Sequence, residues 1–259
     1  MSKYIQNYII TNDAMDINYR LRPISVIMYF QDCFARYMTK NNLAAFDIAD
    51  KDLYWVIAGF NIEFKDELPF WSEEIEVASW LSEVSKLKIY SDFELKHNGK
   101  IFASGDACWF ILNSNTKRPH TTARLFDNIK TTEEYSLGEH KKFTLPDLKE
   151  EITSVVHQTN LSDIDFNNHV NNKSYLNLVE TTADENFKNS HVLKKLSVKY
   201  NKESYLGDIL TCIAYKTGAS NSYFHKITKN NVSVCEVITR WEECSKRNKI
   251  TDCNLAVRK

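Results

Sequence analysis

A short polar segment at residues 162–172 holds the side-chain types that hydrolytic chemistry needs. It reads Ser-Asp-Ile-Asp-Phe-Asn-Asn-His-Val-Asn-Asn and runs directly into a stretch with helical periodicity. Asp165 and His169 can hold or move a proton, and the Asn167 amide can donate a hydrogen bond to an oxygen that gains negative charge. Free backbone N–H groups at a helix start also favour negative charge. We interpret residues 162–172, the signature loop, as part of a reactive site.

An Asx-rich turn that caps a helix is the alternative interpretation of the signature loop. We adopt it for Asn171 and Asn172, because both stand at the start of the helical stretch. Tyr175 and Glu180 lie further along that stretch and are expected to pack against and support the helix. Two features favour chemistry for the rest of the loop: a degenerate copy of it near the N-terminus and an acid, Glu203, downstream.

Composition and charge exclude several classes of function. The 259 residues are 43% hydrophobic and have a formal net charge of −1, so they can bury a core but offer no basic field for nucleic acid. The N-terminal residues show no secretory signal pattern, and no apolar run reaches membrane-spanning length. The six cysteines form no C-x-x-C pair, which favours free thiols in a reducing compartment, and we expect the cytoplasm.

The histidines and glycines indicate whether a metal or nucleotide site is present. The seven histidines are scattered without a metal-ligand spacing such as H-E-x-x-H. The six glycines form no phosphate-binding loop. We therefore predict a site that works with no metal and no cofactor.

Two halves of similar design follow one another along the chain. In each, a stretch of helical periodicity precedes several strand-like segments rich in β-branched and aromatic residues. Residues 117–150 are charged and weakly periodic, and they are predicted to cross from the first half to the second. The expected helices cover residues 23–41 and 172–187, and the expected strands cover 54–64, 75–81, 87–96, 101–112, 192–200, 208–217, 222–229 and 232–242. A helix followed by an antiparallel sheet, twice, predicts an α+β duplication.

The two halves can be matched residue by residue. Arg22–Asp32 lies against Val170–Glu180 at an offset of 148 (180 − 32), Phe64–Glu67 against Tyr200–Glu203 at 136 (203 − 67), and Trp109 against Trp241 at 132 (241 − 109). The offset of 148 places Asp165, Asn167 and His169 opposite Ile17, Tyr19 and Leu21. By this alignment the second half keeps the reactive side chains, while the first half has apolar or aromatic groups in their place and is free to hold an apolar ligand.

The signature loop also carries a resemblance to a known family. Residues 165–175 read Asp-Phe-Asn-Asn-His-Val-Asn-Asn-Lys-Ser-Tyr, and with Tyr200–Ser204, Leu53–Val56 and Pro69–Ser72 they resemble acyl-ACP thioesterases, the plant plastid enzymes and their shorter bacterial relatives. The resemblance extends from about residue 5 to 245. It implies two tandem hotdog domains, each an antiparallel β-sheet wrapped around a central α-helix, with the sheets paired edge to edge. We expect a first domain at 1–120, a crossover at 121–150 and a second domain at 151–259.

The resemblance implies hydrolysis of fatty acyl-[acyl carrier protein] thioesters to free fatty acids. Four residues, the polar cluster, would surround the attacking water: Asp165, Asn167, His169 and Glu203. Family members often have cysteine after the glutamate, but this chain has Ser204, a far weaker nucleophile without a dedicated base. We therefore expect a water mechanism with no covalent intermediate, in which either Glu203 or His169 is the primary base.

The position of the acyl chain follows only from the resemblance. It implies an apolar slot within the first half, formed by the helix and the first strand. The residues expected to line this slot are Ile27, Met28, Phe30 and Trp55. Ordinary core packing explains each of them about equally well, and the preferred length and saturation of the acyl chain are left open.

A basic patch near Glu203 is the expected docking surface for acyl carrier protein, which is acidic. The candidate residues are Lys194, Lys195, Lys199 and Lys202. A solvated charged face explains these lysines equally well. Coenzyme A is also anionic, so the lysines do not decide between the two thiol carriers.

Three other functions fit parts of the pattern. An acyl-CoA thioesterase of the hotdog superfamily is the first. A hotdog hydratase or dehydratase uses Asp-x-Asn-Pro-hydrophobic-His, whereas His169 follows Asp165 by four residues here (169 − 165) with no proline between them. A silent acyl-thioester binding protein would not need the intact polar cluster. For assembly we expect a monomer that imitates a dimer of single hotdogs, or a homodimer.

Overall fold

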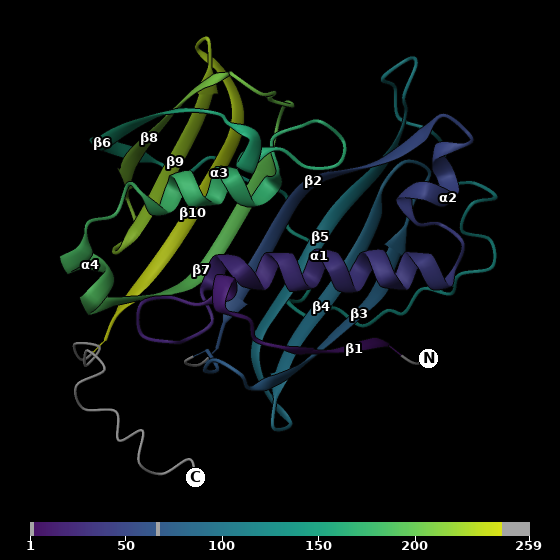
Figure 1. Cartoon of the computed structure of the whole chain (residues 1–259), viewed down its shortest axis with the longest axis horizontal. Helices are drawn as coiled ribbons and strands as arrows, with labels where there is room; N and C mark the ends of the chain where they lie inside the picture. Colours follow the sequence, from purple (N-terminus) through teal and green to yellow (C-terminus); the bar gives the residue numbers. More distant parts are fainter. Residues whose placement is uncertain (1–2, 66–67, 245–259) are drawn as a thin grey trace.

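An antiparallel sheet of ten strands forms the body of the molecule, with α1 and α3 against one face (Figure 1). The computed structural model describes residues 3–65 and 68–244. The strand order is β1-β3-β4-β5-β2-β7-β10-β9-β8-β6. The elements are β1 (Tyr4–Ile9), α1 (Pro23–Lys40), α2 (Ala45–Ala49), β2 (Leu53–Phe64), β3 (Glu74–Val84), β4 (Ile89–His97), β5 (Lys100–Asn113), β6 (Leu148–Gln158), α3 (Asn172–Glu180), α4 (Glu185–Ser190), β7 (His191–Tyr200), β8 (Ile209–Thr217), β9 (Ser222–Lys229) and β10 (Val232–Glu243), with 3₁₀ turns η1 (Asn12–Ala14) and η2 (Leu161–Asp163).

The two halves share one strand order and meet along β2 and β7, which we call the seam. Numbered within its own half, each set of strands runs 1-3-4-5-2 from the outer edge to the seam. The seam pairs Gly59 with Lys199, Asn61 with Ser197 and Glu63 with Lys195. The centre of the pairing is therefore at Asn61 and Ser197. This arrangement confirms the predicted α+β fold of two tandem hotdog domains whose sheets pair edge to edge.

Helix α1 forms where its periodicity predicts it. Pro23 occupies the first turn, where the missing N–H of proline costs nothing. The residues that recur on its inner face are buried against the sheet: Ile24, Ile27, Phe30, Phe34 and Met38. The predicted range of 23–41 is confirmed to within one residue at its end.

Helix α3 is shorter than its sequence suggested. It ends at Glu180, and α4 begins separately at Glu185, so the single helix expected over 172–187 is wrong at its end. The hydroxyls of Thr181 and Thr182 donate to the carbonyl oxygens of Leu178 and Val179, both at 2.7 Å. Threonine side chains that bond nearby backbone groups compete with helical hydrogen bonds, which explains the early end.

Two edge strands, β1 and β6, were not predicted. They pair with β3 and β8 at the outer edges of the sheet. Their one-sided burial gives a weak sequence signal, and β6 begins at Leu148, inside the expected crossover.

Residues 114–147, the crossover segment, contain no helix or strand. The crossover segment is held against the first half, since Trp80 Nε1 donates to Glu134 O at 2.7 Å and Ser136 N to Asp92 Oδ1 at 2.6 Å. The exact domain limits stay a prediction.

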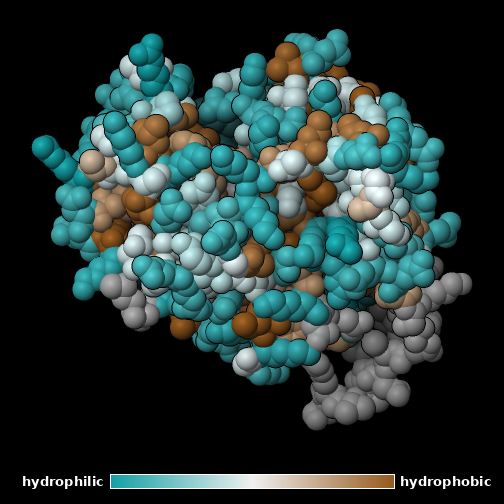
Figure 2. Space-filling view, turned by 180° about the vertical axis from the view of Figure 1, so that it is seen from behind, coloured by the Kyte–Doolittle hydropathy of each residue, from teal (hydrophilic) through white to brown (hydrophobic). Residues whose placement is uncertain are grey.

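The face seen from behind is predominantly hydrophilic. Figure 2 shows apolar side chains scattered among polar ones, not gathered into one broad patch. Within the described residues, no helix is both long and apolar enough to cross a membrane.

Candidate active site

The signature loop is shaped by hydrogen bonds to Asp165. Its Oδ1 atom accepts from the backbone N–H groups of Asn167 at 2.8 Å and His169 at 3.3 Å. The loop closes because Asp165 N donates to His169 O at 2.9 Å and Asn168 N to Asp165 O at 3.0 Å. Asn168 has a φ of 60°, a left-handed conformation that asparagine tolerates better than most residues. The sequence Asp-x-Asn-Asn-His therefore folds into a tight, self-bonded turn.

A backbone contact brings the signature loop to the segment that follows β7. Val170 N donates to Ser204 O at 2.8 Å. As a result His169 Nε2 lies 3.4 Å from Glu203 Oε2, with side chains that are 21% and 32% exposed. An imidazole and a carboxylate thus meet at a position that water and substrate can reach.

Two tyrosines complete the surroundings of Glu203. Tyr205 donates a hydrogen bond to Glu203 Oε2 at 3.0 Å, and its ring meets the His169 ring edge-on with centroids 5.2 Å apart. Tyr54 comes from β2 of the first half, and burial together with the Glu203 charge raises the pKa of its phenol. Burial and the hydrogen bond to Glu203 likewise raise the pKa of Tyr205.

Neither tyrosine was predicted from sequence. Tyr205 stands two residues after Glu203, so alternation along an extended segment was an available signal. Tyr54 lies 149 residues before Glu203 (203 − 54) and carries no local signal. Only the register of the seam brings it to the site.

The structure brings two members of the predicted polar cluster, His169 and Glu203, into direct contact. His169 and Glu203 face each other, whereas the Asp165 carboxylate is directed to its own loop backbone. Asn167 is exposed in the same loop. Asn171 caps α3, as expected, by accepting from Lys173 N at 2.8 Å. The Ser174 N–H is also taken, by Asn171 O, so the helix start offers fewer free donors than expected.

Ser204, the residue that follows Glu203, is fully buried. Its exposure is 0%, and its hydroxyl has no hydrogen-bond partner among the described residues. Two effects act on the pKa of the buried Tyr175 phenol. Burial is the larger and raises the pKa, and the contact with Ser204 lowers it. A buried hydroxyl without a base is poorly placed to act as a nucleophile.

The first half contains a closer copy of the signature loop than sequence matching suggested. Asp16 Oδ1 accepts from Asn18 N at 2.8 Å and Arg20 N at 3.1 Å, and Asp16 N donates to Arg20 O at 2.8 Å. Tyr19 has a φ of 57°. These contacts repeat those of Asp165, so the offset across the loops is 149 (165 − 16), and the alignment at 148 is wrong there. The sequence match placed Asp32 on Glu180, whereas the hydrogen bonds of the two loops place Asp16 on Asp165.

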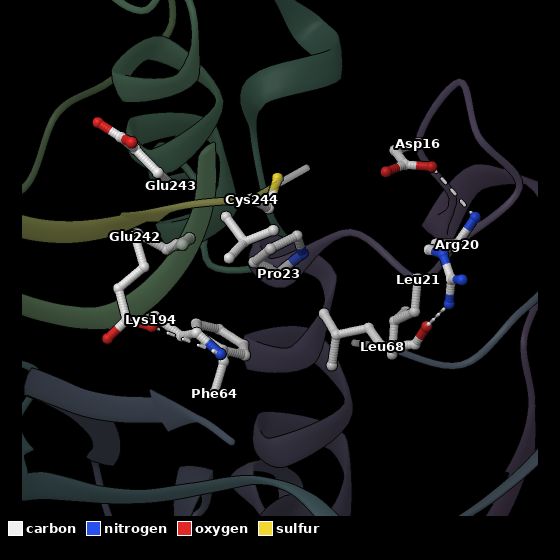
Figure 3. A pocket seen from close by; sticks show the side chains of 12 residues that line it. Asp16, Arg20, Leu21, Pro23, Phe64, Leu68, Lys194, Glu242, Glu243 and Cys244 are labelled. Carbon is white, nitrogen blue, oxygen red and sulfur yellow. Dashed lines mark hydrogen bonds and ion pairs between the residues drawn. The ribbon is translucent and has the colours of Figure 1, made fainter. Parts of the chain in front are cut away.

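Residues 13–23, the first-half loop, therefore keep the acid and the amide. Asp16 and Asn18 stand for Asp165 and Asn167, while Arg20 replaces His169. Leu21 N donates to Pro69 O at 2.8 Å, which repeats the bond from Val170 N to Ser204 O. Pro69 therefore corresponds to Ser204, and the residue before it, Leu68, corresponds to Glu203. Figure 3 shows Arg20 reaching the Leu68 carbonyl, a contact of 3.0 Å. What the first half lost is the imidazole and the carboxylate. Asp66 and Glu67, part of the sequence match, lie outside the described residues.

The residues predicted to line an acyl slot lie in a packed part of the first half. Ile27 and Phe30 are fully buried, and Met28 and Trp55 are partly buried. Phe30 stacks on Phe93 with ring centroids 4.8 Å apart. A slot at this place requires these rings to move, and their role in binding stays a prediction.

Three of the candidate docking lysines, Lys194, Lys195 and Lys199, lie along β7, and Lys202 follows its end. Lys202 is exposed next to Glu203, and Lys199 pairs with Glu236 at 3.3 Å. Lys195 crosses the seam to Glu63. Lys194 lies nine residues from Glu203 (203 − 194), roughly 30 Å away along an extended strand. The structure therefore leaves only Lys199 and Lys202 near the polar cluster.

Among the described residues, no group of three or more His, Cys, Asp or Glu side chains is arranged to hold a metal ion. The absence of a metal and of a cofactor stays a prediction.

Comparisons with known proteins agree on one family. Family models for the acyl-ACP thioesterase N-terminal and C-terminal domains match residues 1–129 and 147–243. The chain is 24% identical over 198 residues to oleoyl-acyl carrier protein thioesterase 2 of Arabidopsis thaliana, and 25% identical over 198 residues to a palmitoyl-acyl carrier protein thioesterase of Gossypium hirsutum. These matches cover 70% and 73% of this chain but 52% and 46% of the relatives, so the chain spans about half their length.

Solved structures show the same fold at low identity. An acyl-ACP thioesterase from Bacteroides thetaiotaomicron superposes with a TM-score of 0.81 at 20% identity, covering 92% of this chain and 97% of that one. The 12:0-ACP thioesterase from Umbellularia californica gives a TM-score of 0.77 at 18% identity, covering 93% and 97%. With both domain models matched in order, this chain belongs to the acyl-ACP thioesterase family.

Proposed function

We propose that this chain hydrolyses fatty acyl-[acyl carrier protein] thioesters and releases free fatty acid. The observation that carries the proposal is the contact of His169 Nε2 with Glu203 Oε2 at 3.4 Å, at a partly exposed position beside the start of α3. Family membership supports the reaction class, and the relatives named above are thioesterases for oleoyl- and palmitoyl-acyl carrier protein.

In the proposed mechanism a water molecule attacks the thioester carbonyl. Glu203 or His169 takes the proton of the water, and the leaving thiolate is protonated in turn. The exposed amide of Asn167 is the proposed donor to the oxyanion, because the N–H groups of Lys173 and Ser174 at the start of α3 are already bonded. Asp165 acts through the loop backbone that positions His169 and Asn167. Ser204 takes no covalent part.

Acyl carrier protein is the proposed carrier of the acyl group, with Lys199 and Lys202 as the docking residues nearest the site. The other two lysines, Lys194 and Lys195, and the slot around Ile27, Met28, Phe30 and Trp55 are retained as part of the proposal. A cytoplasmic location and a monomer that imitates a hotdog dimer, or a homodimer of it, are likewise proposed.

A thiol-release assay tests this function. The purified chain is incubated with acyl-carrier and acyl-CoA thioesters of several chain lengths, and free thiol is followed over time. We expect thiol release, with higher kcat/KM for the carrier-protein substrates. A preference for the CoA series would favour the acyl-CoA thioesterase. A change in double bonds or hydroxyls without thiol would favour the lyase, and no turnover of any substrate would favour a silent binding protein.

A further inference from the structure

A cavity of about 850 Å³ opens in the second half, between the helices α3 and α4 and the sheet. Residues 15–18 of the first-half loop lie at one side of it. No member of the polar cluster is among the described residues that line it. This volume is within the range of small-molecule binding sites, and it is separate from the candidate active site.

The corresponding space in the first half is filled with aromatic rings. Three structural offsets relate the halves: 149 for the loops and helices (172 − 23), 136 for the seam strands (197 − 61), and 132 for the hairpins, where the pair Phe93–Gly105 corresponds to His225–Val237. They place Phe30, Phe34, Trp55, Phe60, Phe93 and Trp109 opposite Val179, Ala183, His191, Leu196, His225 and Trp241. All six residues of the second set line the cavity.

The aromatic set of the first half is closely packed. Phe30 stacks on Phe93 at 4.8 Å between centroids, and Phe34 stacks on Trp109 at 4.2 Å. In the second half Val179 and Ala183 stand at the positions of Phe30 and Phe34, so the rings that would fill the space are missing. Protein interiors are otherwise close-packed, so an open cavity of this size is a candidate ligand-binding site.

The inner wall of the cavity carries no charge. His225 is 5% exposed, and its two ring nitrogens are within hydrogen-bond distance of the Thr182 hydroxyl at 3.2 Å and the Thr239 hydroxyl at 3.0 Å. Burial lowers the pKa of His225 to about 3, so the ring is neutral under ordinary conditions. The remaining wall includes Leu176, Leu193 and Trp241. Such a wall suits an uncharged aliphatic chain.

Charged residues also line the cavity, and Arg22 stands out among them. Lys188, Lys216, Asp16, Glu180 and Asp184 are the other charged residues that line it. Arg22 Nε is buried with no hydrogen-bond partner among the described residues. Its NH1 atom is 3.8 Å from Glu180 Oε2, and burial raises the pKa of Glu180 while Arg22 lowers it. Because Arg22 lines the cavity, its positive charge is placed to attract the carboxylate of a ligand.

We propose that this cavity binds a free fatty acid, with the aliphatic chain against Val179, Leu196 and His225 and the carboxylate at Arg22. The inference rests on the proposed function for the choice of ligand, since a free fatty acid is the product of that reaction. By the repeat, this site corresponds to the candidate active site and its acyl slot. The first-half loop beside it has no imidazole or carboxylate at the positions of His169 and Glu203, and the cavity next to this loop is open.

Calorimetric titration of dodecanoic acid into the purified full chain tests the proposal. We expect saturable binding of one molecule per chain, and we expect it to persist in His169→Ala, which alters the active site. Dodecanol serves as an uncharged probe of the same length. Absence of saturable dodecanoate binding overturns the proposal.

Val179→Phe restores the ring that the first half has at this position. We expect it to weaken dodecanoate binding about tenfold or more by filling the cavity, and to leave the hydrolysis of acyl-carrier thioesters within about threefold. Val156→Phe, at an exposed position on β6, is the matched control and should change neither. If Val179→Phe fails to fold, as judged by its melting temperature, Ala183→Phe tests the same point just after the end of α3.

Arg22→Met tests the carboxylate anchor. We expect it to weaken dodecanoate binding about tenfold, the scale of one lost hydrogen bond to a charged group, and to leave dodecanol binding unchanged.

Unchanged dodecanoate binding in Val179→Phe and Ala183→Phe overturns the proposed location. A shift of thioester chain-length preference in Val179→Phe or Ala183→Phe would instead identify the cavity as the substrate slot. That result also overturns the proposal of a fatty-acid site separate from the active site.

The two proposals fail independently. Thiol release without dodecanoate binding removes the fatty-acid site and leaves the thioesterase function standing. Dodecanoate binding that shows the expected variant pattern, in a chain that releases no thiol from any thioester, removes the function and leaves the site.

Discussion

Asp165 and His169 belong to one short motif, yet they differ in what their side chains contact. The Asp165 carboxylate accepts from two backbone N–H groups, whereas His169 faces Glu203 at 3.4 Å. Tyr205 adds a donor to the same carboxylate oxygen. In the proposed mechanism Asp165 is therefore a positioning residue, and the reacting groups are His169, Glu203 and Asn167.

The buried state of Ser204 leads to a direct test of the water mechanism. We expect Ser204→Ala to keep kcat/KM within about tenfold, while Glu203→Ala and His169→Ala each lose roughly 10²-fold or more, the scale of a general base. Steady-state thiol release gives the rates, and mass spectrometry searches for an acyl-enzyme. A trapped acyl-serine together with an inactive Ser204→Ala would contradict the mechanism.

Tyr205→Phe removes the donor to Glu203 Oε2 and keeps the ring beside His169. We expect kcat to fall about tenfold with little change in KM, because a hydrogen bond to a charged group is worth about 1.5–3 kcal/mol and this one orients a reacting carboxylate. Tyr19→Phe, in the first-half loop, is the matched control. Equal kcat values for the two variants would show that the Tyr205 hydroxyl has no role.

Among the elements, the two loops that precede α1 and α3 have the same build and different chemistry. Asp16 and Asp165 each accept from two backbone N–H groups of their own loop. We expect Asp16→Ala and Asp165→Ala each to lower the free energy of unfolding by about 1–2 kcal/mol, the scale of a lost cap. Only Asp165→Ala should lower kcat by more than tenfold, since only its loop holds His169. Urea unfolding and thiol release measure the two effects, and an equal loss of activity in both variants would contradict this division.

The crossover segment is fixed to the outside of the first half by His140. Its Nε2 atom is 2.8 Å from Ser82 Oγ and 3.7 Å from Asp92 Oδ2, and its Nδ1 atom is 4.0 Å from Asp106 Oδ2. The His140 ring also stacks on Tyr90 and meets Tyr135 edge-on. Burial of the ring lowers its pKa, but the contact with Asp106 and the charges of Asp92 and Asp106 outweigh burial and raise the pKa of His140 overall.

This raised pKa predicts a pH-dependent stability. A group whose pKa is higher in the folded state stabilises the fold fully below its unfolded value, and the contribution is lost as pH rises through the folded pKa. We therefore expect the difference in unfolding free energy between the wild type and His140→Gln to be larger at pH 6 than at pH 9. His120→Gln, in the same crossover segment, is the control. A difference that grows toward pH 9 would contradict the assignment.

The whole molecule places a candidate active site across its two halves. Tyr54 comes from the first half and Glu203 from the second, and the seam holds them together. Gly59 marks the closest approach, since a Cβ atom there would lie 2.5 Å from the carbonyl oxygen of Val198. Only glycine lets the two strands pair at this point without a shift of backbone.

Gly59→Ala therefore tests the dependence of the site on the seam. We expect a loss of about 1–3 kcal/mol in the free energy of unfolding, the cost of overpacking, together with reduced kcat because Tyr54 and Glu203 move apart. Gly218→Ala is the matched control: its Cβ would meet the Asp147 carboxylate at 3.3 Å, and that side chain can move. Equal melting temperatures and rates for the two variants would show that the seam tolerates a Cβ.

Local patterns in the sequence determined the helix α1, the central strands and the signature loop, whereas Glu203 was added only by the family resemblance. The apolar periodicity of residues 23–40 fixed which face of α1 is buried, and a contiguous motif was enough to identify Asp165, Asn167 and His169 as one loop. These features depend on neighbours a few residues apart, which a single sequence displays.

The tertiary structure alone decided which distant residues share a site. Tyr54 reaches Glu203 through strand register. The first-half loop aligns at 149 because its hydrogen bonds repeat, although the match of Asp32 with Glu180 had favoured 148. The open cavity also needed the structure, because whether Val179 and His225 leave a void depends on which side chains face them from other strands. Packing across long sequence separations is set by register and side-chain volume together, and neither is visible in the local pattern of one chain.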